Sequence, residues 1–269
     1  MERKEAANGL QLIKIAAIKL KGHFSAVFMG ALAMTTPLVL ILFMSVLMSI
    51  LFAQSWIISI GVVLFVILVG PLQIGYIKYF NDALDGKQPR ISMVYSQLRL
   101  NIFTLRTIYI AGLLFLMYIV GGFVWIVPAG FAVSAFSMTL FFLEKFEYPK
   151  LSQAMKECAK NMIGNRLAMF SYKLLFYFLY LLILIVGLMF ILLVKMLTFE
   201  NLIISWIVAV CAVIVFIFLY TFITVYFHSS NQIFFEDVLT RKEKKKMAKV
   251  KSVKNSTDQI NLNQEDKKE

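Results

Sequence analysis

The chain is poor in charge and rich in apolar residues. Of its 269 residues, 16% are charged and 60% are hydrophobic, and its mean hydropathy is +0.80. Soluble domains carry about 25% charged residues, and a single core of this size cannot bury so large an apolar share. The shortage of charge therefore excludes an ordinary soluble globular protein and favours a protein that sits in lipid.

Cysteine and histidine are scarce, with two residues of each type, and two cysteines give no disulfide framework. His23 and His228 are expected at the cytoplasmic ends of the first and last membrane spans. With Glu236 or Asp237 they could form a metal or catalytic site. Polar capping at the membrane interface is the simpler interpretation of both histidines.

Catalytic motifs are also missing. The sequence holds no Gly-rich phosphate loop, no His-Glu-x-x-His pattern, no CxxC pair and no Gly-x-Ser-x-Gly elbow. We therefore predict a protein that is not an enzyme, with no catalytic residue, no cofactor-binding residue and no metal ligand.

Six runs of the sequence lack Asp, Glu and Arg, and only Lys173 lies inside them, near an end where it can snorkel. A helical span needs about 20 apolar residues, and in lipid a helix satisfies its own backbone polar groups. The predicted fold class is all-α: a polytopic helical membrane protein with about six spans plus cytoplasmic-side amphipathic helices. The predicted spans are 24–51, 56–77, 107–126, 129–143, 170–194 and 202–227.

The run 129–143 is short, because a helix of that length rises only about 22 Å. The preceding run carries Gly121 and Gly122 and ends near a proline and a glycine. A hairpin that turns inside the membrane is therefore the competing prediction for this region. The predicted structural bends of the whole chain are Pro37, Pro71, Pro128 and Gly130.

The basic residues predict the orientation. Twenty-six of the 27 Lys and Arg residues fall in the N-terminal segment, in two connections and in the tail, which all lie on one side of the predicted spans. Lys195 alone falls on the other side. Since basic residues are retained in the cytoplasm, we predict a multi-pass protein with both termini cytoplasmic. The net charge of +12 then reflects topology, and nucleic acid is not an expected partner.

Two segments are predicted to be amphipathic helices on the inner leaflet. Residues 148–166 place apolar side chains at helical spacing, with Pro149 in the first turn and Gly164 at the C-terminal end. Residues 10–21 have a similar but weaker pattern and precede Gly22. The first 23 residues are therefore assigned to an N-terminal cytoplasmic amphipathic segment, followed by a membrane domain over 24–239.

The sequence also contains a candidate internal repeat. Residues 17–23 parallel 159–165, and each of these segments precedes a long span. Residues 79–84 parallel 234–239, and each follows the second span of a pair. A unit of surface helix, glycine, two spans and an aromatic-aromatic-x-Asp-x-Leu ending would then occur twice in the same orientation, although the match is short enough to arise by chance.

Several of these segments resemble a bacterial family. Residues 126–131 (IVPAGF), 134–138 (SAFSM) and 154–170, with the ending at 234–239 (FFEDVL), resemble the integral membrane family known as domain of unknown function 975. The resemblance covers roughly residues 10–240 and departs from the family pattern at Ala129 and at Cys158, where serine is usual. It implies a location in a bacterial plasma membrane, mainly of Gram-positive bacteria, and the family has no assigned activity.

The C-terminal residues 240–269 are predicted to be a polybasic and then disordered cytoplasmic tail. A basic cluster behind a span attracts anionic lipid head groups, and the competing interpretation is a plain stop-transfer flank. From Ser252 onward the sequence is polar, mixed in charge and without aromatic residues, which predicts disorder. The predicted lipid-contact residues are Arg241, Lys242, Lys244, Lys245, Lys246, Lys249 and Lys251.

Three functions remain open on the sequence. The first is a non-enzymatic plasma-membrane protein that acts in envelope physiology through lipid, peptide or membrane-protein partners. The second is a small uncoupled transporter or flippase-like protein, because no charged residue lies at mid-span to drive ion coupling. The third is immunity to a membrane-active peptide.

The charge distribution makes the topology testable. In a variant without native cysteines, Ser55→Cys and Thr198→Cys should react with an impermeant maleimide added to intact cells. Ser92→Cys and Ser256→Cys should react only after permeabilisation. Labelling of the Ser92→Cys variant from outside would overturn the predicted orientation.

Overall fold

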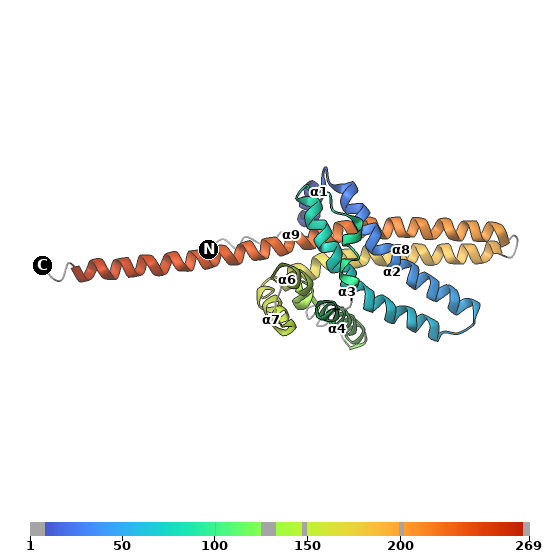
Figure 1. Cartoon of the computed structure of the whole chain (residues 1–269), viewed down its shortest axis with the longest axis horizontal. Coiled ribbons are helices and arrows are strands. Elements are labelled where there is room, and N and C mark those ends of the chain that lie inside the picture. The colour runs from blue at the N-terminus through green and yellow to red at the C-terminus, as the bar shows by residue number, and fades with distance from the viewer. Residues whose placement is uncertain (1–8, 100, 125–132, 147–149, 199–201, 266–269) are drawn as a thin grey trace.

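The computed structural model describes residues 9–99, 101–124, 133–146, 150–198 and 202–265. Within these ranges it is helical and contains no strand, which confirms the all-α prediction (Figure 1). The α-helices are α1 (Gly9–Leu20), α2 (Phe24–Leu51), α3 (Trp56–Leu84), α4 (Ile102–Val124), α6 (Thr139–Phe146), α7 (Leu151–Asn161), α8 (Arg166–Thr198) and α9 (Leu202–Glu265). Two 3₁₀ turns, η1 (Ile91–Met93) and η2 (Ser96–Leu98), precede α4.

Four helices are long and apolar enough to cross a membrane. A fifth is counted if Ile91–Leu98 and Ile102–Met117, which meet at 89°, form one broken span. The structure therefore supports a helical protein with several spans, and the predicted number of six is not confirmed. The four are Phe24–Ser49, Trp56–Leu84, Arg166–Gly187 and Val210–Thr240.

The predicted span 129–143 differs most from the structure. Its first residues, with Pro128 and Gly130, lie outside the described residues. The described part that follows contains helical residues 133–136 and then the eight-residue α6, in which Thr139 to Leu143 are all buried. Five consecutive buried residues cover every face of a helix, so this segment packs inside the protein. A short apolar run has the same composition whether it faces lipid or a protein core.

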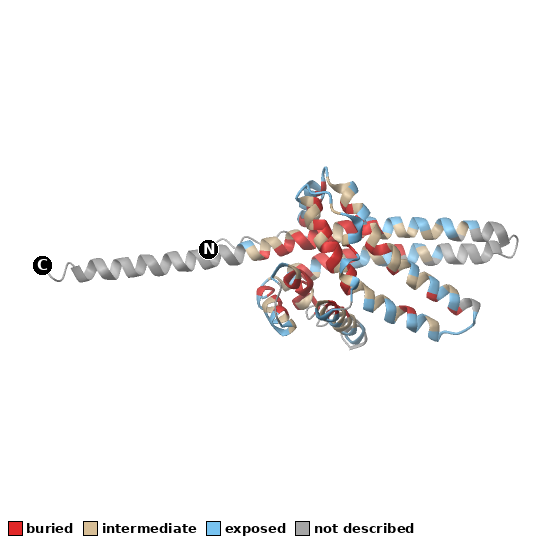
Figure 2. Cartoon of the chain, in the orientation of Figure 1, coloured by how far each residue is buried: buried red, intermediate tan, exposed pale blue. Residues whose placement is uncertain are grey.

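Two helical hairpins dominate the architecture. The pairs α2–α3 and α8–α9 project in the same direction from a common base, where α1, α4, α6 and α7 gather (Figure 1). Burial follows this arrangement, because buried residues concentrate at the base and exposed ones along the arms (Figure 2). The exposed side chains of the arms include Val63, Leu64, Ile214 and Val215, as expected for helices that face lipid.

Helix α9 passes through the base and continues beyond it to Glu265 (Figure 1). The prediction of disorder after Ser252 differs from this result. Composition does not explain this helix, because half of residues 252–265 are Ser, Thr, Asn or Asp, which are weak helix formers. The side chains from Arg241 to Lys251 lie outside the described ones, so their contact with lipid stays a prediction.

The hairpins are joined by contacts between α2 and α9. Phe28 stacks on Phe218 with ring centroids 5.9 Å apart. Deeper in the base, the hydroxyl groups of Thr35 and Thr221 form a buried hydrogen bond of 2.6 Å. Because the bond is buried, it fixes the register of α2 against α9 where an unpaired hydroxyl would be costly.

The predicted bend residue Pro37 has a specific role in the structure. Proline has no N–H, so Pro37 leaves the carbonyl of Ala33 without its usual helical partner. The hydroxyl of Tyr95, between η1 and η2, donates a 2.7 Å hydrogen bond to that carbonyl. Both Pro37 and Pro71 lie inside continuous helices. Pro37 therefore serves to dock the 91–98 segment against α2.

The structure supports the internal repeat. Each unit has a short helix, a glycine in the left-handed region and a helical hairpin, with φ of 91° at Gly22 and 83° at Gly164. The two aromatic-Asp-Leu endings have the same burial pattern: the first, second and fifth residues of 79–84 and of 234–239 are buried and the others are half-buried. Similar sequence, element order and burial together favour a duplicated unit.

Close packing at the base makes one glycine testable. A Cβ atom at Gly75 of α3 would collide with the backbone carbonyl of Val94. Gly75→Ala should therefore destabilise the protein by about 1–3 kcal/mol, measured by thermal unfolding in detergent. In the control Gly112→Ala, the added Cβ atom meets only Val66, at 3.9 Å. This variant should be neutral or stabilising by up to about 1 kcal/mol. Equal stability of the two variants would contradict the packing of η1 on α3.

Candidate functional site

A run of polar residues is buried where α9 passes α3. His228, Ser229, Ser230, Asn231 and Gln232 are consecutive, and each is at most 8% exposed. Five successive helical residues point in all directions, so α9 is surrounded by other elements at this level. The prediction that His228 is an interfacial cap is therefore wrong, because tertiary packing covers it.

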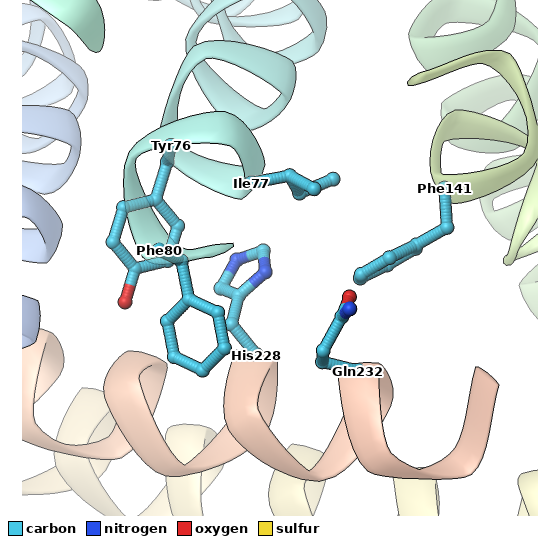
Figure 3. Close-up of a pocket in the computed structure, with 6 residues that line it drawn as sticks. All are labelled: Tyr76, Ile77, Phe80, Phe141, His228 and Gln232. Carbon is cyan, nitrogen blue, oxygen red and sulfur yellow. The ribbon is translucent and has the colours of Figure 1, made fainter. Parts of the chain in front are cut away.

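Side chains from three helices enclose a narrow crevice on one face of this run (Figure 3). The ring of His228 lies between the α3 side chains and the amide of Gln232, which rises from α9 toward α6. Tyr76 meets the His228 ring edge-on, with centroids 5.1 Å apart. The crevice contains about 160 Å³ of space between atoms and is too narrow for a water molecule. Its walls are Tyr76, Ile77 and Phe80 of α3, Phe141 of α6, and His228 and Gln232 of α9.

Several buried polar atoms at this junction have no hydrogen-bond partner. They are Tyr76 Oη, His228 Nδ1, Ser230 Oγ, Asn231 Oδ1 and Gln232 Oε1, which we call the junction cluster. An unpaired buried group costs about 1–3 kcal/mol. Three of these side chains, Tyr76, His228 and Gln232, line the crevice, whereas Ser230 and Asn231 are not among its lining residues. The groups that line the crevice favour a site that is completed by an occupant.

Neighbouring polar groups show that the base can satisfy hydrogen bonds elsewhere. Ser229 donates to the carbonyl of Val225 at 2.7 Å. Tyr172 donates to the carbonyl of Phe227 at 2.8 Å. Outside the junction cluster, Arg166 Nε also lacks a partner, so the unpartnered groups are concentrated in the cluster but are not confined to it.

Two lysines lie close to the crevice walls. The Nζ atom of Lys145 is 5.7 Å from the ring of Phe235, which packs on Phe141 with centroids 5.5 Å apart. The Nζ atom of Lys173 is 6.0 Å from the ring of Phe227, which packs on His228 at 5.6 Å. No carboxylate pairs with either lysine in the described part of the chain. Lys173 is 6% exposed, so the protein covers its side chain, and its snorkelling to the membrane interface stays a prediction.

The cytoplasmic edge of the crevice is tied to α1. Gln232 donates through its Nε2 atom to Glu236 at 3.1 Å, and Glu236 pairs with Lys19 at 2.9 Å. Both ionic side chains are more than a third exposed, and such pairs contribute about 0–1 kcal/mol. This contact orients the Gln232 amide with its oxygen free, yet it is weak enough to open.

The histidine site considered in the sequence does not form. His23 lies in the turn between α1 and α2, whereas His228 lies in the crevice and Glu236 is engaged by Lys19 and Gln232. Among the residues that the structure describes, no group of three or more His, Cys, Asp or Glu side chains is placed to hold a metal ion. This result covers Asp237 as well, so the described residues form no metal site that includes it.

Comparisons with known proteins leave the family open. No family model, curated protein or solved structure matches the chain. The resemblance to the family of domain of unknown function 975 therefore stays a prediction.

The sequence reasoning missed Tyr76 and Gln232. Tyr76 is one of many aromatic residues in apolar helices, so its role depends on which helix lies opposite. The signal that could have been used is the run 228–232, five polar residues between two apolar segments of one helix. Such a run inside a helix of this length predicts burial against another polar or functional group.

Cys158 illustrates a buried group that is satisfied. Its Sγ atom donates to the carbonyl of Ala135 at 3.2 Å, and burial raises the pKa of the Cys158 thiol to about 11. Because the thiolate is the reactive form, iodoacetamide at pH 8 should not modify Cys158 in the folded Cys211→Ser variant. Modification should become complete after denaturation in SDS, as measured by mass spectrometry. Rapid modification of the folded protein would show that α7 leaves its site.

Proposed function

We propose that this chain is a non-enzymatic, multi-pass protein of a bacterial plasma membrane that recognises a polar group of a lipid or peptide partner at the junction cluster. The observation that carries the proposal is the set of five buried polar atoms without partners. They come from α3 and α9, which belong to different hairpins. An occupant of the crevice that pairs with Tyr76, His228 and Gln232 would bridge α3 and α9, which suits a role in envelope physiology through binding.

The proposed topology has both termini in the cytoplasm. The two hairpins project in one direction, and α1, α7 and the C-terminal part of α9 lie at or beyond the opposite end (Figure 1). The Lys and Arg residues concentrate on that end of the predicted spans. Since α3 ends and α7 begins at the base, the chain between them must cross the membrane twice or not at all. Six full spans, or four with a re-entrant pair, satisfy this condition.

Helix length supports a position of the cluster near the membrane interface. A rise of about 1.5 Å per residue puts Tyr76 about 30 Å from Trp56, where α3 begins. That distance equals the thickness of the hydrocarbon core. With the hairpin tips at the outer surface, Tyr76 and the crevice lie at the level of the inner head groups. Polar groups at this level are positioned to meet a lipid head group or a peptide that lies on the inner leaflet.

An uncoupled transporter or flippase-like protein is the second candidate. The crevice lies between two repeated units, which is where repeat-built transporters place their substrate sites. Transport requires the occupant to reach the other surface, whereas binding does not. Protein-dependent flux across proteoliposomes, insensitive to proton and sodium gradients, would favour this candidate over simple recognition.

The proposal predicts that the cluster costs stability when it is empty. In delipidated protein, Tyr76→Phe and His228→Phe each remove an unpartnered polar atom while they keep a ring in place. Each should raise the free energy of unfolding by about 1–3 kcal/mol, measured by thermal and denaturant unfolding in detergent. In the control Tyr172→Phe, the hydroxyl that donates to the carbonyl of Phe227 is removed. This variant should instead have a free energy of unfolding lower by about 1 kcal/mol.

Loss of stability in both Tyr76→Phe and His228→Phe would contradict the proposal. That result would show that the two polar groups are satisfied within the folded protein and stabilise it, so that no occupant is needed.

A further inference from the structure

We propose that the crevice binds the head group of a phospholipid in which the phosphate is esterified to a polyol with free hydroxyl groups. The hydroxyls would bond to His228 and Gln232, and the phosphate would lie near Lys145 and Lys173. This inference rests on the proposed recognition function and names its ligand class.

The hydrogen-bonding groups of the crevice select a hydroxyl. The free Oε1 atom of Gln232 only accepts, so its partner must donate a hydrogen. A phosphate or carboxylate oxygen accepts and cannot serve it. An ammonium group donates, but it would approach the cation Lys173 across the Phe227 ring. A hydroxyl group donates to Gln232 and can either accept from or donate to His228 Nδ1, which is also free.

The remaining walls select a carbon skeleton that carries these hydroxyls. Ile77, Phe80 and Phe141 present apolar and aromatic surface to the crevice. A bare inorganic ion would lose its hydration there without replacement. A polyol places C–H groups against the rings while its hydroxyls reach the α9 side chains. The crevice therefore fits a small polyol better than an ion.

Lys145 and Lys173 are the reason to expect a phosphate in the ligand. Lys145 and Lys173 each lie one phenylalanine ring away from a crevice wall, on α6 and α8. Neither has a carboxylate partner among the described residues, so an anion would complement them. A polyol linked to a phosphate joins the two parts of the site in one molecule.

The position of the crevice favours a lipid as the source of this head group. Tyr76 lies about 30 Å along α3 from the hairpin tip, at head-group depth. The crevice is closed in this structure, since it is too narrow for water. Entry requires a shift of α6 or α1, and α1 is held to α9 by the exposed pair of Lys19 and Glu236.

The test compares three ligands on the full-length protein in phosphatidylcholine nanodiscs. Phosphatidylglycerol carries a phosphate and two hydroxyls, and phosphatidylmethanol carries the same charge without hydroxyls. Glycerol 1-phosphate is the soluble form of the same head group. Binding is measured by competition against a fluorescent phosphatidylglycerol. We expect phosphatidylglycerol to bind at least tenfold more tightly than phosphatidylmethanol, and glycerol 1-phosphate not to compete at millimolar concentration.

Variants separate the two halves of the site. His228→Phe and Gln232→Met should each reduce the affinity for phosphatidylglycerol about tenfold and leave phosphatidylmethanol unchanged. The double variant Lys145→Gln and Lys173→Gln should weaken both lipids equally. The matched controls His23→Phe and Gln153→Met lie outside the crevice and should change neither affinity.

Three results would overturn the inference: equal affinity for the two lipids, an unchanged preference in both crevice variants, or competition by glycerol 1-phosphate at the lipid's own affinity. The last would assign the site to a soluble polyol phosphate. None of these results changes the unfolding prediction for His228→Phe. If the lipid preference fails while that variant is stabilised, recognition at the cluster stands and only the ligand class is wrong. If Tyr76→Phe and His228→Phe are both destabilised, the proposed function itself is wrong.

Discussion

The contact of α9 with α2 and α3 is the interaction on which the rest of the structure depends. Each hairpin alone is a pair of apolar helices, and in lipid such pairs have no hydrophobic force that brings them together. What joins them at the base is directional: the buried Thr35–Thr221 hydrogen bond and the aromatic contacts of Phe24 and Phe28 with α9. Once α9 is held there, its polar run faces α3, and the crevice follows from that geometry.

Much of the helical architecture could be predicted from composition, because long apolar runs must be helices in lipid. The residues at which those helices end could not be predicted from composition. The run predicted over 56–77 continues as α3 to Leu84 because Tyr79, Phe80 and Ala83 pack into the base. The run 129–143 shows a different limit: within its described part, Thr139 to Leu143 are buried in the protein, and composition does not distinguish a protein core from lipid.

The candidate site could be predicted only in part. His228 and Lys173 were noticeable in the sequence because charged and polar residues are rare in these helices. Their burial depends on which helices meet, and a pattern along one helix carries no information about that. The basic residues of the tail give the stronger local signal, yet four of the five unpartnered atoms of the junction cluster lie in the run 228–232, where each residue alone is unremarkable.

The duplicated units explain why the crevice lies where it does. The two endings, 79–84 and 234–239, have the same burial pattern, but the residues just before them differ. The first unit has Ile74, Gly75 and Tyr76 there, and Gly75 lets the Val94 backbone approach α3 closely. The second unit has Ser229, Ser230 and Asn231 at the matching positions. Four of the five unpartnered atoms of the junction cluster lie on the polar α9 copy, and one, Tyr76 Oη, lies on the α3 copy. That asymmetry is what a binding site requires, since a symmetric apolar interface would close without any need for an occupant.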